Sequence, residues 1–73
     1  MARMTKTSKE NLLVAERIEI YFNSTSQAYN ILVYRGERFG YLSDASGVIN
    51  YDSISDARRV TKRIRPDLEP TTI

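Results

Sequence analysis

The stretch AYNILVYRGERFGYLSDASGVINYDSISDARRVTKRIR, residues 28–65, decides the fold. It contains three short runs rich in β-branched and aromatic residues, at 29–34, 39–42 and 48–51, separated by segments that contain glycine. Runs of this kind between turn residues are typical of β-strands. The stretch therefore predicts three antiparallel strands, which are followed by a helix.

The loop at Gly36 sets the register of the first two strands, since glycine supplies the permissive backbone of a tight turn. A two-residue loop puts one set of side chains on a common face of the sheet: Leu32, Tyr34, Phe39 and Tyr41. The other face then carries Ile31, Val33 and Leu42. A three-residue loop would shift the register by one and mix the two sets.

Two placements of the aromatic side chains follow from this register. In the favoured one, the helix covers the face with Tyr34 and Tyr41, and the aromatic rings are core. In the other, the helix covers the aliphatic face and leaves an exposed aromatic patch flanked by Arg35 and Arg38. Such a patch would suit the stacking of bases or the docking of a protein.

The helix expected after Asp52 or Ser53, either of which can cap it, has two distinct sides before Pro66 ends it. The apolar positions fall within about 120° of the helix circumference: Ile54, Ala57, Val60, Thr61 and Ile64. The other side, here called the basic helix face, consists of Arg58, Arg59, Lys62, Arg63 and Arg65. Arginine binds phosphate and carboxylate groups in a bidentate manner, so this face is a candidate binding surface.

The first part of the chain predicts a short helix and then a strand. Thr7 is the expected N-cap, with Glu10 completing a capping box. From Arg17 the pattern alternates with period two as far as Phe22, which favours a strand. A helix that continues to Tyr21 is the alternative.

The predicted fold class is therefore α+β. A three- or four-stranded antiparallel sheet packs on a C-terminal helix, with a short N-terminal helix or arm. Residues 7–66 form one domain, 1–6 a flexible arm and 67–73 a flexible tail. Over residues 28–65, the order of elements is similar to that of the sheet-plus-helix DNA-binding modules of integrase arm-binding domains and plant ethylene-response factors. This resemblance is one of topology.

Composition argues against catalysis. The 73 residues include no Cys and no His, and the net charge is +2. The commonest general base is thus missing, and neither a zinc site nor a disulfide can form. Asp52 and Asp56 could share a magnesium ion, but helix capping explains both. We expect no enzyme activity, no metal and no cofactor. The apolar runs are too short for a membrane span, so a cytoplasmic protein is expected.

Two functions remain as hypotheses. The first is a nucleic-acid-binding module, for double-stranded DNA, that uses the basic helix face together with Arg35 and Arg38. The alternative is a small protein-interaction module, an inhibitor or adaptor of the kind that phages encode. It would use the aromatic face with Tyr34 and Tyr41, or an open sheet edge. The basic helix face would in that case bind an acidic protein surface in place of nucleic acid. A homodimer through a sheet edge is compatible with either.

Overall fold

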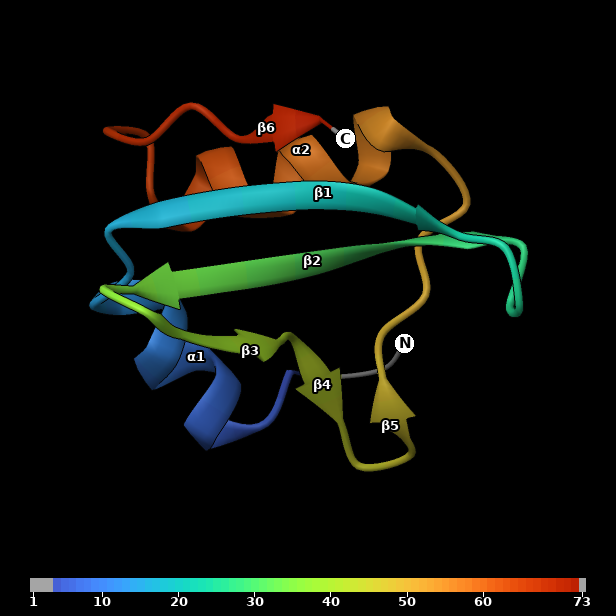
Figure 1. Ribbon diagram of the computed structural model, residues 1–73, viewed down its shortest axis with the longest axis horizontal. Coiled ribbons are helices and arrows are strands. Elements are labelled where there is room, and N and C mark those ends of the chain that lie inside the picture. Colours follow the sequence, from blue (N-terminus) through green and yellow to red (C-terminus); the bar gives the residue numbers. More distant parts are fainter. Residues whose placement is uncertain (1–3, 73) are drawn as a thin grey trace.

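The computed structural model describes residues 4–72. A four-stranded sheet in the order β3-β2-β1-β6 forms its centre, and both helices lie behind it in the view of Figure 1. The elements in chain order are α1 (Lys6–Leu13), β1 (Arg17–Asn23), β2 (Ala28–Arg35), β3 (Arg38–Tyr41), β4 (Ser43–Asp44), β5 (Gly47–Val48), α2 (Ile54–Ile64) and β6 (Thr71–Thr72). The predicted α+β class is confirmed, as is the change from helix to strand before Arg17. Neither helix is long or apolar enough to span a membrane.

The first helix begins earlier than predicted. Thr5, not Thr7, is the N-cap: its hydroxyl accepts a hydrogen bond from the Ser8 backbone N–H at 3.1 Å. Ser8 is buried, and its own hydroxyl accepts a bond from the backbone N–H of Ser43 at 2.9 Å. This tertiary contact fixes the start of α1 two residues ahead of the predicted capping box.

Of the two loop lengths considered for the β2–β3 hairpin, the structure has the two-residue loop. Arg35 pairs with Arg38, and Gly36 adopts a φ of 62° in the turn between them. The aliphatic side of the sheet then faces the helices. Its side chains form the core together with residues of both helices: Leu12, Ala15, Ile18, Ile20, Ile31, Val33, Leu42 and Ala57.

The third predicted strand, residues 48–51, is not part of the main sheet as a regular strand. Gly47–Val48 instead pairs with Ser43–Asp44 in a separate two-stranded hairpin. Tyr51 forms one isolated bridge to Tyr29 in β2. The buried Asn30 carboxamide explains the irregular path, because it donates hydrogen bonds to the Ile49 carbonyl and the Asn50 side chain, both at 2.9 Å. The three strands predicted within residues 28–51 therefore do not form one sheet; the three consecutive antiparallel strands of the main sheet are β1, β2 and β3.

Both ends of the chain contact the domain. Of the expected arm, residues 1–3 lie outside the described part, Met4 bridges to Asp44, and α1 begins at Lys6. The sequence also put residues 67–73 outside the domain. The structure instead packs Leu68 against the core, buries Pro70, and runs β6 parallel to β1 at the edge of the sheet (Figure 1). Partial burial of Leu68 and burial of Pro70 explain why the C-terminal segment packs on the domain. Because β6 is parallel to β1, the sheet is mixed.

Candidate interaction surface

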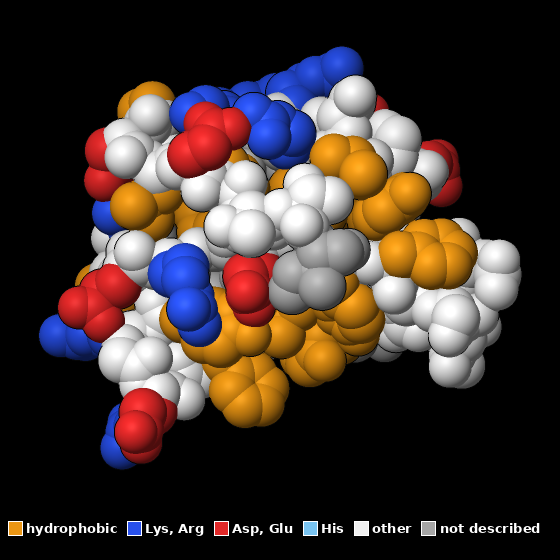
Figure 2. Space-filling view, turned by 45° about the horizontal axis from the view of Figure 1, so that its top comes forward, with side chains coloured by type: hydrophobic (Ala, Val, Ile, Leu, Met, Phe, Trp, Pro, Cys, Tyr) orange, Lys and Arg blue, Asp and Glu red, His pale blue; other side chains and the backbone are white. Residues whose placement is uncertain are grey.

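An uncovered layer of aromatic side chains lies on the side of the sheet away from the helices. We call it the aromatic face; it consists of Tyr21, Tyr34, Phe39 and Tyr41. Phe39 is 63% exposed and Tyr41 36%, whereas Leu32 beneath them is 8% exposed. Figure 2 shows apolar and aromatic side chains gathered on this side of the molecule.

The favoured expectation that the helix covers these rings is therefore wrong, and the alternative placement is the one observed. The physical reason lies in β1. Its outward side carries Arg17 and Glu19 beside the aromatic rings, and these charges need water. Its inward side carries Ile18, Ile20 and Phe22, and the two isoleucines are fully buried. The alternation in β1 is visible in the sequence, and burial of Arg17 and Glu19 under a helix would be costly.

Side-chain contacts hold the rings of the aromatic face in place. Tyr34 and Phe39 have ring centroids 6.0 Å apart, and the Tyr21 and Tyr41 hydroxyls lie 3.3 Å from each other. The Arg17 guanidinium lies 4.2 Å from the centroid of Tyr34, in cation–π contact. A hydrogen bond to Glu19 raises the pKa of Tyr34, and the bond to Tyr41 raises the pKa of Tyr21. Rings fixed in this way lose little freedom when a ligand covers them.

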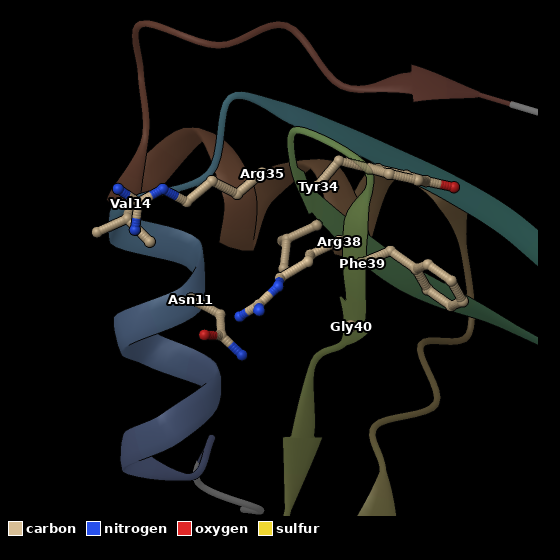
Figure 3. Close-up of a pocket in the computed structure, with 8 residues that line it drawn as sticks. Asn11, Val14, Tyr34, Arg35, Arg38, Phe39 and Gly40 are labelled. Carbon is tan, nitrogen blue, oxygen red and sulfur yellow. The ribbon is translucent and has the colours of Figure 1, made fainter.

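A cleft of about 240 Å³ adjoins the aromatic face. We call it the hairpin cleft, because it lies between α1 and the β2–β3 hairpin (Figure 3). Asn11 of α1 and Val14, the C-cap residue of α1, form one side, and Arg35 and Arg38 of the hairpin form the other. Tyr34 and Phe39 also line the cleft, although their rings point to the other side of the sheet (Figure 3).

The basic helix face is less available than its sequence indicates. The Glu69 carboxylate lies between two of its cations and forms ion pairs with Arg58 and, at 2.8 Å, with Lys62. Arg59 lies 3.7 Å from Asp56. Carboxylates are visible among the cations at the top of Figure 2. Within residues 4–72, Arg63 is the one member of this face that forms no salt bridge.

Arg65 stabilises the fold and is not free to bind a ligand. Its guanidinium donates hydrogen bonds to the carbonyls of Leu12, Leu13 and Ala15 at 2.8–3.0 Å, and it forms a bidentate pair with Asp67. Its side chain is only 16% exposed. The sequence could not reveal this role, because the carbonyls lie at least 50 residues away in the chain. The bond to Asp67 raises the pKa of Arg65 and lowers that of Asp67.

The structure therefore divides the predicted site residues into two groups. The β2–β3 hairpin carries Tyr34, Arg35, Arg38 and Tyr41, with the tyrosines on the side away from the helices and the arginines on the helix side. The basic helix face lies on α2, behind the sheet in Figure 1. Arg17 and Tyr21 lie beside Tyr34 and Tyr41 and were not predicted as site residues. The alternation of β1 puts them on one side of the strand, but it does not indicate that this side is exposed.

No protein-family model, curated protein or solved structure matches this chain. Among residues 4–72, no three potential ligands of the types His, Cys, Asp and Glu lie close enough to hold a metal ion.

Proposed function

We propose that this protein is a non-enzymatic interaction module that docks another protein on its aromatic face. The exposure of this face carries the proposal: Phe39, at 63%, and the tyrosines beside it are left uncovered by both helices. Aromatic residues are enriched in the centres of protein interfaces, where they account for much of the binding energy. An exposed aromatic patch on a rigid sheet is thus a ready docking surface.

The charge of this face favours a protein over a single nucleic-acid strand. Platforms that stack bases combine their aromatic rings with a positively charged groove for the backbone. Here Arg17 lies on the ring of Tyr34, and Glu19 raises the pKa of the same tyrosine. The two charges offset each other, and Glu19 would repel a phosphate. A partner with an apolar centre and a polar rim fits the face better.

Duplex DNA binding through the basic helix face remains a prediction, with weaker support than the sequence alone suggested. Arg58 and Lys62 would have to leave Glu69, and Arg65 its carbonyl partners, before they could contact phosphates. Arg59 and Arg63 are exposed and could make such contacts directly. With about two contacts, log K against log salt would fall with a slope of only about −2.

Affinity capture from nuclease-treated extracts of the source cells tests the docking proposal. The wild-type protein is compared with a variant carrying Phe39→Ser and Tyr41→Ser, which removes exposed rings without touching the core. The matched control carries Arg59→Gln and Arg63→Gln. We expect one or more proteins to be retained by the wild type and the control and lost from the aromatic variant.

Two results would count against the proposal. One is a partner retained equally by the aromatic variant and the wild type. The other is binding of a generic DNA duplex, at about 50 mM salt, that is lost in the arginine variant while no protein is captured. The second result would restore the basic helix face as the functional surface.

A further inference from the structure

We propose that the hairpin cleft receives a carboxylate side chain of the docked partner, held by Arg35 and Arg38. This inference rests on the proposed docking function and specifies the chemistry of the partner. It predicts that the partner carries an acidic residue near the apolar side chain that covers the aromatic face. Four observations support it: an unpaired pair of arginines, an apolar lining, the local charge, and the position of β3 at the edge of the sheet.

Arg35 and Arg38 are a like-charged pair directly opposite each other at the end of the hairpin. Like charges at opposed positions of neighbouring strands destabilise the pairing. Within residues 4–72, neither guanidinium forms a salt bridge that would offset this cost. Figure 3 shows Arg38 pointing between β3 and α1 toward Asn11, and Arg35 extending toward Val14. An anion placed between the two would remove the repulsion and satisfy both.

The lining of the cleft strengthens such an interaction. Val14 and Val33 present apolar surface, and Gly40 presents no side chain. Removal of water from one side of an ion pair lowers the local dielectric and strengthens the attraction. The Asn11 carboxamide adds a donor opposite the arginines (Figure 3).

Gly40 keeps this cleft open. Glycine is not required there by the backbone, since only Gly36 and Gly47 among the glycines have a positive φ. A Cβ at position 40 would lie 3.8 Å from the Asn11 amide nitrogen, which is an ordinary contact. A side chain at this position would therefore be accommodated sterically, but it would project into the space between the hairpin and α1.

The local charge favours a carboxylate over a phosphate. Two carboxylates accompany the two arginines at the hairpin end: Glu37 lies in the turn, and Glu16 accepts a hydrogen bond from the Gly36 backbone N–H. The surroundings are thus close to neutral, which suits a single negative charge. The planar guanidinium also matches a planar carboxylate in bidentate geometry.

The two sites lie on opposite sides of the β2–β3 hairpin, because Tyr34 and Phe39 alternate with Arg35 and Arg38 along its strands (Figure 3). β3 is the edge strand of the sheet. A partner that covers the rings of Tyr34 and Phe39 would therefore reach around β3 to place a carboxylate in the cleft. The cleft would then confer specificity for partners with an acidic residue at that place, because charge complementarity mainly selects among partners.

An NMR titration with two blocked tripeptides tests the cleft directly. The probe is acetyl-Glu-Phe-Glu-amide, and its neutral match is acetyl-Gln-Phe-Gln-amide. We expect saturable shifts of the side-chain N–H resonances of Arg35, Arg38 and Asn11 with the acidic peptide. Arg35→Gln combined with Arg38→Gln should weaken its binding about tenfold, as loss of charged hydrogen bonds does. Arg59→Gln with Arg63→Gln is the control and should bind normally.

Equal binding of the neutral peptide, or no effect of the cleft variant, would overturn the inference. So would inorganic phosphate, if it saturated the same resonances at a lower concentration than the peptide. The cleft variant also enters the capture experiment, where the retained partner should bind about tenfold more weakly. Capture that depends on Phe39 and Tyr41 but not on the cleft arginines would refute this inference alone. Capture that depends on neither would refute the docking function itself.

Discussion

Single polar residues connect segments of this chain that are distant in sequence. Asn30 is fully buried in β2 and holds the path of residues 49–50, while Arg65 after α2 holds the end of α1. Buried polar groups are costly unless their hydrogen bonds are complete. No described side-chain nitrogen or oxygen is buried without a partner. The exact partners of such residues determine the fold, yet composition and periodicity carry no information about them.

Replacement of Arg65 should destabilise the protein. Arg65→Met keeps the length of the side chain but leaves the carbonyls of Leu12, Leu13 and Ala15 without their shared donor. We expect a loss of about 1–3 kcal/mol in the free energy of unfolding, measured by urea denaturation. Arg63→Gln, at an exposed position of the same helix, should stay within about 0.5 kcal/mol of wild type. Equal stability of the two variants would contradict the structural role of Arg65.

The ion pairs of Glu69 should make stability depend on pH. Hydrogen bonds from Lys62 and then Arg58 lower the pKa of Glu69 below its ordinary value of 4.5. A carboxylate with a lowered folded-state pKa stabilises the protein above its unfolded pKa, and this contribution is lost as pH falls through the folded value.

Glu69→Gln should therefore reduce the melting temperature at pH 7 and have progressively less effect as the pH falls through 4.5 toward 3. Thermal denaturation of the two proteins across this range measures the difference. An effect of the substitution that is equal at pH 7 and pH 3 would show that the ion pairs do not form. Added salt should reduce the difference at pH 7, since all three side chains are exposed to solvent.

The elements differ in how far local sequence specifies them. The β2–β3 hairpin was predicted from Gly36 and the two apolar runs, but its register was left open between a two-residue and a three-residue loop. The pairing of Arg35 with Arg38 shows the two-residue loop. The apolar side of α2 was also predicted: Ala57 and Thr61 are fully buried at its centre, and Ile64 is partly buried. The two-residue strand β6 was not predicted. It pairs with β1 some 50 residues away and has no periodic pattern of its own.

A larger side chain at the centre of α2 should disrupt its packing on the sheet. Ala57 has no exposed surface and is part of the core between α2 and the sheet. Ala57→Leu adds volume to this close-packed contact, for which we expect a cost of about 1–3 kcal/mol in the free energy of unfolding. Arg59→Leu, two residues along on the exposed side of α2, controls for the change in helix propensity. A neutral effect of Ala57→Leu would show that α2 is not packed closely on β1 and β2.

At the scale of the whole molecule, the helices cover one side of the sheet, and the other side is left to the solvent. The cationic side chains of α2 are largely paired with carboxylates of the chain itself, whereas the aromatic face has no covering segment among residues 4–72. This contrast reverses the order of the two functions that the sequence suggested. The preference for protein docking over DNA binding depends on which side of the sheet the helices cover. Neither the strand pattern nor the number of charges in the sequence determines this tertiary property.

Site-specific photo-crosslinking in the source cells tests the docking claim most directly. Phe39→p-benzoylphenylalanine places the reactive ketone on the aromatic face, and Arg63→p-benzoylphenylalanine places it on exposed α2 as the matched control. After irradiation, we predict a protein adduct of defined mass from position 39 and none from position 63. An adduct from position 63 alone, to protein or to nucleic acid, would contradict the assignment of the aromatic face as the binding surface.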